Sequence, residues 1–88
     1  MRLDKFLKVS RLAKRRTVAN DLCSGGCVLV NRKVAKPATE IHVEDELSLD
    51  LGHHQLVVKV VEVPAKAVPA QSASSLYTVV SETYNSRD

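Results

Sequence analysis

The hydrophobic residues nearest the N-terminus recur with the period of an α-helix. Leu3, Phe6 and Leu7 lie at i, i+3 and i+4, so they share one face of a helix predicted over residues 2–12. The basic residues of the same segment lie three apart on roughly the opposite face, and they are Lys5, Lys8 and Arg11. The first predicted helix therefore has an apolar side and a basic side.

A second helix is predicted from about residue 16 to residue 24, where the Gly25-Gly26 pair ends it. Its apolar stripe consists of Val18, Ala19, Leu22 and Cys23. Three consecutive cations, residues 14–16, come at its N-terminus, where the helix macrodipole disfavours positive charge. Local helix stability does not explain them, so we interpret them as contacts to a molecule outside the protein.

After the glycines the hydrophobic period changes to two. Runs rich in Val and Leu predict strands over residues 27–30, 47–51 and 56–63, and a short strand over 33–35. Asn31 and Arg32 are expected to form a hairpin turn that is longer or distorted, because Arg tolerates a positive φ less well than Gly. Residues 39–46 and 52–55 are expected to be connections.

The C-terminal quarter changes in composition. Residues 64–75 have two prolines and many small side chains, which predicts a flexible linker after a domain of residues 1–63. Residues 76–88 are predicted to form a tail with a short helix that docks on the core, although 77–80 suit a strand equally well. The fold class is therefore α+β, with two N-terminal helices packed on a small antiparallel sheet and a short C-terminal element.

The length of 88 residues allows one small hydrophobic core. No apolar run reaches the roughly 20 residues of a membrane span, and the N-terminus lacks the pattern of an export signal. Cys23 and Cys27 are too few and too close to form a disulfide framework, and we interpret both as small core hydrophobes. These features favour a cytoplasmic protein.

Charge is distributed unevenly along the chain. Residues 1–36 hold ten Lys and Arg against two Asp, a net charge of +8, whereas residues 37–88 hold three against eight acids, a net charge of −5. Between Lys5 and Arg16 there are six cations and no acid, so the cations are not compensated by neighbouring ion pairs. Clustered cations gain free energy by displacing counterions from a phosphate backbone, and the pattern therefore predicts a nucleic-acid partner.

Residues for catalysis, metal binding or cofactor binding do not form a recognisable set. His53 and His54 are adjacent in a predicted turn, where their side chains should diverge into solvent, and His42 stands apart in a connection. The spacing of the cysteines and histidines matches no usual zinc site, and no phosphate-binding glycine loop or nucleophile elbow is present. We expect a protein without a cofactor or a metal that is not an enzyme.

The small number of aromatic residues limits the kinds of nucleic acid that the chain could bind. Phe6, Tyr77 and Tyr84 are its only aromatic residues, too few for readout of single strands by base stacking. A cationic helix pair suits the backbone of folded RNA. Reading of the DNA major groove stays open as the alternative, with Asn20 as its one base-reading candidate and a dimer as its requirement.

Residues 1–52 resemble a known RNA-binding family. The segments RLDKFL at 2–7, RRT at 15–17 with Ala19, VLVN at 28–31 and DEL at 45–47 are similar to the S-four-type RNA-binding domain, or alpha-L motif. The resemblance implies two helices and a small antiparallel sheet that dock on structured RNA. Relatives that add this domain to pseudouridine synthases or tRNA synthetases carry catalytic domains that this sequence lacks.

The opening RLDKFLKVSRLAKRRT also resembles the stand-alone members that serve bacterial ribosome-associated quality control. That resemblance implies a monomer that binds the obstructed large ribosomal subunit through its ribosomal RNA and the peptidyl-tRNA. It also implies support for the partner factor that recruits alanyl-tRNA, so that the stalled chain receives an alanine tail. A heat-shock relative involved in ribosome recycling is the alternative, but it has a long basic C-terminal extension.

Carried onto this sequence, the family resemblance implies a set of RNA contacts. They are Arg2, Lys5, Lys8, Arg11, Lys14, Arg15, Arg16, Asn31 and Lys33, with Asp4 orienting a neighbouring Arg. Three positions depart from the family pattern: Arg15 replaces a Ser helix cap, Arg32 a hairpin Gly and Glu44 a Gly. The first should cost about 1 kcal/mol of capping free energy. The other two affect the turn geometry that orients Asn31 and Lys33.

Overall fold

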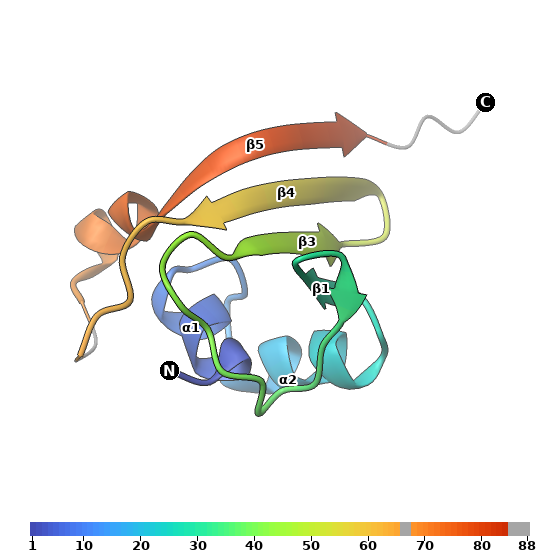
Figure 1. Cartoon of the computed structure of the whole chain (residues 1–88), viewed down its shortest axis with the longest axis horizontal. Coiled ribbons are helices and arrows are strands. Elements are labelled where there is room, and N and C mark those ends of the chain that lie inside the picture. Colours follow the sequence, from blue (N-terminus) through green and yellow to red (C-terminus); the bar gives the residue numbers. More distant parts are fainter. Residues whose placement is uncertain (66–67, 85–88) are drawn as a thin grey trace.

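The computed structural model describes residues 1–65 and 68–84 of the chain. Two short helices, α1 (Leu3–Val9) and α2 (Arg16–Ser24), lie against one face of a five-stranded antiparallel sheet (Figure 1). The sheet has the order β2-β1-β3-β4-β5, and a 3₁₀ helix, η1 (Ala70–Leu76), precedes the last strand. The strands are β1 (Val28–Val30), β2 (Lys33–Val34), β3 (Glu46–Asp50), β4 (His54–Val60) and β5 (Tyr77–Tyr84). The predicted α+β class, with two helices on a small antiparallel sheet, is confirmed.

The helical layer forms because its apolar spacing faces the sheet. Leu3, Phe6 and Leu7 are fully buried, as their i, i+3, i+4 spacing predicts. α2 has its predicted bounds, but α1 ends at Val9 instead of residue 12, because Arg11 takes a left-handed conformation with φ 65°. Neither helix in the described part of the chain has the length or the apolar content needed to cross a bilayer.

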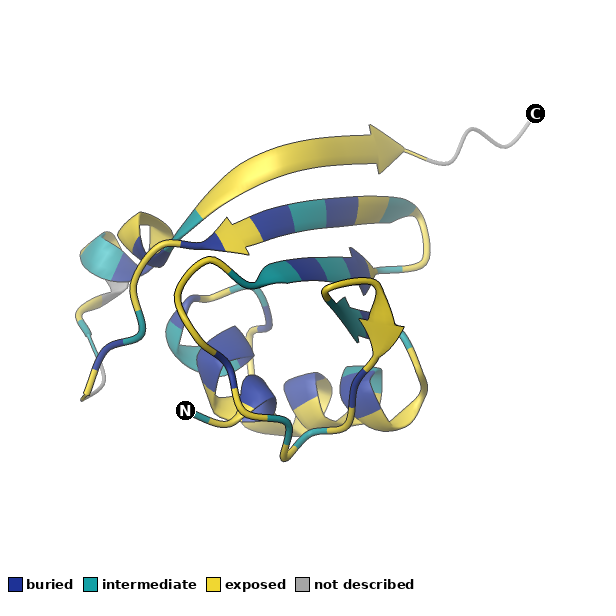
Figure 2. Ribbon diagram, in the orientation of Figure 1, coloured by how far each residue is buried: buried dark blue, intermediate teal, exposed yellow. Residues whose placement is uncertain are grey.

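The other half of the core comes from alternating residues of β3 and β4. Leu47 and Leu49 of β3 are buried beside Leu56, Val58 and Val60 of β4, as period-two strands predict. The two strands pair in one continuous antiparallel register. In Figure 2 the buried positions cluster where these strands face the helices, so the core lies between the two layers.

The β1–β2 hairpin has a two-residue turn, so the expected longer or distorted turn is wrong. Val30 pairs with Lys33, and the turn residues Asn31 and Arg32 have φ values of 51° and 71°. Both values belong to the type of turn that matches the twist of a hairpin, and Asn adopts it readily. Arg32 adopts it against the preference of a residue with a Cβ. Glu44, the other position where the family pattern has Gly, also has a positive φ, of 79°.

The expected C-terminal helix is wrong, because Tyr77–Tyr84 forms β5 and pairs with β4 along its length. The β-branched and aromatic residues of this segment meet an open sheet edge, and that pairing outweighs their helical spacing. Residues 85–88, the rest of the predicted tail, lie outside the described residues. Seven of the eight β5 residues are exposed, which Figure 2 shows as an almost uniformly exposed strand.

The expectation of a flexible linker over 64–75 is wrong for the part that η1 occupies. Ala73 of the predicted linker and Leu76, the last residue of η1, are buried, and the Leu76 carbonyl accepts hydrogen bonds from the backbone N–H groups of Val61 and Glu62. Small residues therefore pack η1 closely against the end of the sheet. Residues 66–67 lie outside the described part of the chain.

His54 is not the solvated turn residue that the sequence predicts. Its side chain is 16% exposed, its ring stacks on Tyr84 with centroids 5.0 Å apart, and its Nε2 lies 3.6 Å from Glu82 Oε2. The His53 ring does not diverge from it, since the two centroids are 4.8 Å apart. His54 pairs with Tyr84 of β5. The sequence pattern does not predict this strand, and it therefore places His54 in solvent.

The positive φ of Arg32 predicts an unusual order of stability for two substitutions. Both Arg32→Gly and Arg32→Ala remove the long side chain and its 3.8 Å ion pair with Glu46. At a φ of 71° the Gly variant should be more stable than the Ala variant by about 1 kcal/mol, because only Ala has a Cβ that strains this conformation. Chemical denaturation of both variants measures the difference.

The matched control is the exposed residue Asn20 in the middle of α2. There Asn20→Ala should be more stable than Asn20→Gly by about 1 kcal/mol, because a regular helix favours Ala. An Ala variant as stable as the Gly variant at position 32 would contradict the turn geometry.

Candidate nucleic-acid interface

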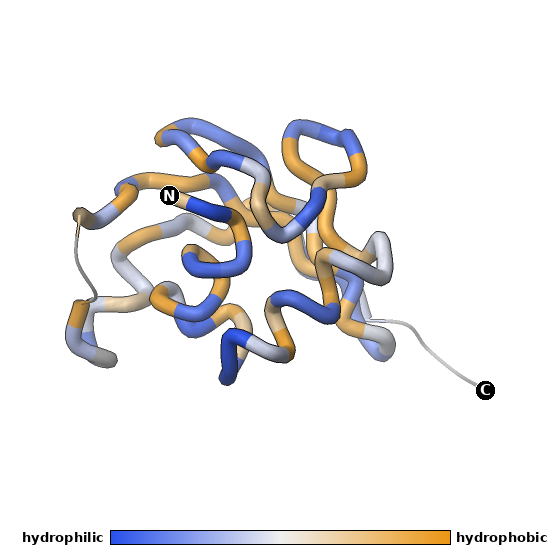
Figure 3. Tube along the Cα trace, turned by 90° about the horizontal axis from the view of Figure 1, so that it is seen from below, coloured by the Kyte–Doolittle hydropathy of each residue, from blue (hydrophilic) through white to orange (hydrophobic). Residues whose placement is uncertain are grey.

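The predicted cations of the N-terminal region lie on or next to α1, on the following turn and at the start of α2, and we call them together the basic surface. All of them are exposed except Lys8, which is half-buried. The members of this basic surface are Arg2, Lys5, Lys8, Arg11, Lys14, Arg15 and Arg16. Figure 3 looks onto the molecule from below Figure 1 and shows hydrophilic positions interrupting hydrophobic ones along the chain. Ala19 and Cys23 of the predicted α2 stripe are buried in the core, whereas Val18 of the same stripe is 42% exposed, so that part of the prediction is wrong.

Asp4 is a buried carboxylate that ties two of these cations together. Its side chain is only 3% exposed, and Oδ1 lies 3.1 Å from Arg2 Nε and 3.5 Å from Arg16 Nη2. Arg2 also donates to Oδ2 at 3.3 Å, and the backbone N–H of Lys5 donates to Oδ1 at 2.8 Å. The ion pairs expected for Asp4 with a neighbouring Arg are therefore present, and they reach Arg16 at the start of the second helix as well.

The charges around Asp4 determine its ionisation. Burial is the largest single influence and would raise the pKa of this carboxyl. The charge of Arg16, the hydrogen bond and charge of Arg2 and the backbone donor of Lys5 together outweigh it, so the pKa of Asp4 lies below its ordinary value of 3.8. Asp4 is therefore ionised at neutral pH and holds both guanidinium groups by charge.

The position of Arg2 is also fixed by the backbone on either side of it. The N–H groups of Leu3 and Asp4 donate to the carbonyls of Thr39 and Pro37 at 2.7 and 3.1 Å, and the Ile41 N–H donates to the Met1 carbonyl at 2.8 Å. The Met1 ammonium lies 2.7 Å from Glu40 Oε2. The hydrogen bond from this ammonium, followed by its charge, lowers the pKa of Glu40. We call these contacts the N-terminal strap.

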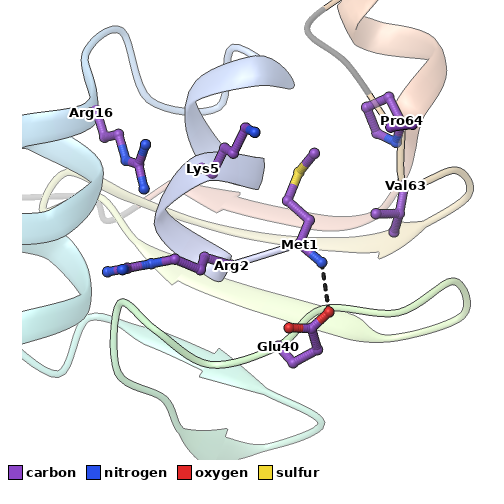
Figure 4. Close-up of a pocket in the computed structure, with 8 residues that line it drawn as sticks. Met1, Arg2, Lys5, Arg16, Glu40, Val63 and Pro64 are labelled. Carbon is purple, nitrogen blue, oxygen red and sulfur yellow. Dashed lines mark hydrogen bonds and ion pairs between the residues drawn. The ribbon is translucent and has the colours of Figure 1, made fainter.

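Arg2, Lys5 and Arg16 line one side of a hollow of about 620 Å³ (Figure 4). Its other side is made by Met1 and by the chain that leaves β4, including Val63 and Pro64. Arg16 also borders a second hollow of about 400 Å³, together with Asp4, Thr17, Asn20 and Asp21. The structure thus brings three of the seven predicted cations to one concave site.

Of the other four cations, Lys8 lies in the last turn of α1, and Arg11, Lys14 and Arg15 lie between the two helices. Arg11 is exposed at its positive φ, and its N–H donates to the Lys8 carbonyl at 3.1 Å. Arg15 occupies the N-cap of α2, where its side chain makes no capping hydrogen bond. The missing cap bond is what replacement of a Ser cap predicts, and Arg15 is exposed to solvent.

Asn31 and Lys33 belong to the β1–β2 hairpin and not to the basic surface. The Asn31 amide accepts from the backbone N–H of Glu46 at 3.0 Å and donates to Asp45 Oδ1 at 3.1 Å. These bonds hold the turn to the start of β3, so Asn31 has a structural role. Lys33 is exposed on β2.

Sequence reasoning missed the other components of the hollow. Met1, Glu40, Val63 and Pro64 have no local pattern that indicates function, and only the fold brings them beside Arg2. The cysteines do not contribute to it: Cys23 is buried, and burial, followed by the charge of Asp4, raises its pKa to about 11. Across residues 1–65 and 68–84, no three side chains suited to metal binding come together.

Comparison with known proteins identifies what this arrangement resembles. The family model described as the S4 domain matches residues 1–47. An RQC P-site tRNA stabilizing factor of Streptococcus pneumoniae is 42% identical over 83 residues, which cover 94% of this chain and 93% of the relative. A protein of the same name from Halalkalibacterium halodurans is 46% identical over 82 residues, covering 93% and 92%.

Heat-shock relatives are matched over less of their own length. Heat shock protein 15 of Escherichia coli is 31% identical over the whole chain, which spans 66% of that protein. The trimeric crystal structure of Vibrio cholerae Heat Shock Protein 15 superposes with a TM-score of 0.83 at 29% identity, covering 91% of this chain and 81% of the other.

The ion pairs of Asp4 with Arg2 and Arg16 predict that Asp4→Asn loses stability in a pH-dependent way. At pH 7 this variant should be less stable than the wild type by about 1–3 kcal/mol, because a neutral amide replaces a buried, ion-paired acceptor. Since the folded-state pKa of Asp4 is lowered, its contribution is present above about pH 4 and is lost as the pH falls through that lowered value. Chemical denaturation of both proteins between pH 7 and pH 2 measures the difference in their free energies of unfolding.

The control is Asp21→Asn, which removes an exposed acid of α2. It should change stability by less than about 0.5 kcal/mol at any of these pH values. A gap between wild type and Asp4→Asn that stays constant down to the lowest pH would contradict the role given to the charge of Asp4.

Proposed function

Because the chain belongs to the S4 domain family, we propose that it is a non-enzymatic, RNA-binding factor of ribosome-associated quality control. The observation that carries the proposal is the basic surface of seven cations, in which one buried carboxylate, Asp4, pairs with Arg2 and Arg16. Preset cations bind phosphates without the entropy loss of ordering long side chains.

The proposed target is the obstructed large ribosomal subunit together with its peptidyl-tRNA. The names of relatives that this chain covers almost from end to end support it, since they are P-site tRNA stabilizing factors. The phosphate contacts in this proposal are the seven cations of the basic surface, with Lys33 as a contact from the hairpin and Asp4 as the residue that orients Arg2 and Arg16. Asn31 contributes by holding that hairpin in place.

The finer steps of the proposal follow from the same family. The protein holds the tRNA on the large subunit as a monomer, while the factor that recruits alanyl-tRNA extends the stalled chain with alanine. The match in length favours this role over that of the heat-shock relatives, because this chain spans only 66% of Escherichia coli heat shock protein 15. The close structural superposition makes a heat-shock-type recycling role the second candidate.

Arg16→Ala tests the proposal at a residue that lines both hollows. Its side chain is half-exposed and its pair with Asp4 is the longer of the two, so the variant should melt close to the wild type. Binding to purified large subunits that carry peptidyl-tRNA should weaken by about 1–3 kcal/mol, the usual cost of losing a charge-assisted hydrogen bond. Filter binding and thermal melting give the two readouts.

Lys59→Ala is the matched control, because it removes one positive charge from the sheet, where Lys59 pairs with Glu44 at 2.9 Å. It should bind ribosomes like the wild type. Wild-type binding should fall with salt by a log–log slope of about 0.7–0.9 per phosphate contact, and Arg16→Ala should reduce that slope by about 1. Equal losses of binding in the two variants, or a wild-type affinity that does not change with salt, would contradict the proposal.

A further inference from the structure

The hollow between the N-terminal strap and the end of β4 is lined by apolar side chains as well as by cations. We propose that this hollow holds a single unpaired nucleotide of the bound RNA, with its phosphate on Arg2, Lys5 and Arg16 and its base on the half-buried Val63, which the buried Met1 and Pro64 side chains flank. The proposal rests on the proposed RNA-binding function and adds a site for a base to it.

The first argument is the separation of two chemistries inside one concavity. Figure 4 shows the guanidinium groups of Arg2 and Arg16 on the side of the hollow next to α2, and Val63 and Pro64 on the opposite side, with the Met1 side chain between them. A nucleotide has the same division, since it combines an anionic phosphate with a flat base whose faces are apolar. A phosphate alone would have no use for the apolar wall.

The second argument is size and access. The hollow is open to solvent, and its volume of about 620 Å³ lies within the range of clefts that bind small organic ligands. A base stacked and paired inside a helix presents only its edges, so its face cannot reach a recessed wall. A base from a bulge, loop or strand end can, and proteins that bind such bases place them against aromatic or apolar side chains. Here the wall is aliphatic, which explains how a chain with few aromatics can still hold a base.

The third argument is electrostatic. Three cationic side chains and the Met1 ammonium border the hollow against a single carboxylate, Glu40, which is already paired with the ammonium at 2.7 Å. The hollow is therefore positive and attracts a phosphate. Glu40 is the antiparallel bridge partner of Arg2, and its carboxylate lies beside the Met1 ammonium (Figure 4).

The test compares two RNA hairpins that differ only in one bulged adenosine. The wild-type protein should bind the bulged hairpin about fivefold more tightly than the fully paired hairpin, the lower end of what one stacked base contributes. Val63→Asn should lose that preference and bind both hairpins as the wild type binds the paired one, because it makes the wall polar without changing charge. Val63→Leu should keep the preference.

The matched control is Val61→Asn, an exposed valine two residues earlier that does not line the hollow. It should keep the wild-type preference for the bulge. Val63 is partly buried against the core, so a measurement on the wild-type protein removes any dependence on the folding of the variants. In methyl NMR spectra, the bulged hairpin should shift the Met1 and Val63 methyl signals upfield by ring currents, and the paired hairpin should not.

The outcomes separate this inference from the function on which it rests. Equal wild-type affinity for the two hairpins, with no upfield shift of the Met1 and Val63 methyls, overturns the nucleotide site while RNA binding stands. Absence of binding to either hairpin and to large subunits overturns both. A bulge preference that Val63→Asn removes and Val61→Asn keeps supports the site.

Discussion

The basic surface depends on one buried carboxylate. Asp4 has its side chain 3% exposed and contacts two guanidinium groups whose residues are separated by fourteen positions in the sequence. A charge in that position is costly unless it is paired, and the nearer partner, Arg2, still pairs with Asp4 when Arg16 is replaced. The consequence is that Arg2 and Arg16 keep a fixed spacing before any ligand arrives. Lys14 and Arg15, by contrast, form no ion pair within residues 1–65 and 68–84.

The fold serves this arrangement through the N-terminal strap. Backbone hydrogen bonds from residues 1–4 to residues 37–41 fasten the first turn of α1 to the loop before β3, so Arg2 is held by main chain as well as by Asp4. The same strap places Met1 opposite the end of β4, which creates the hollow. The acidic residues concentrate on the sheet and its connections. Glu44, for example, pairs with Lys59 at 2.9 Å and raises the pKa of that lysine through its hydrogen bond and then its charge. This division places the positive charge on the helical layer.

Local patterns predicted the two helices and the first four strands, because each of these elements depends on neighbours a few residues away. The i, i+3, i+4 spacing of Leu3, Phe6 and Leu7 and the alternation around Leu47 are sufficient for those elements. Residues 77–84 were mispredicted because their sequence suits a helix or a strand, and the open edge of β4 decides between them. Three features depend on contacts between distant segments. They are the pairing of Asp4 with Arg16, the place of Val63 in the lining of the hollow, and the stacking of His54 on Tyr84. No local periodicity encodes such contacts, so they required the structure.

The central claim is that the helical layer binds the large ribosomal subunit and tRNA through charges that the fold has already positioned. Sedimentation of tagged protein from a bacterial lysate through a sucrose gradient, with sequencing of the RNA that co-purifies, tests it most directly. The account predicts that the protein travels with large-subunit fractions and that the recovered RNA is enriched in large-subunit ribosomal RNA and tRNA. Protein that stays at the top of the gradient without enriched RNA would contradict it.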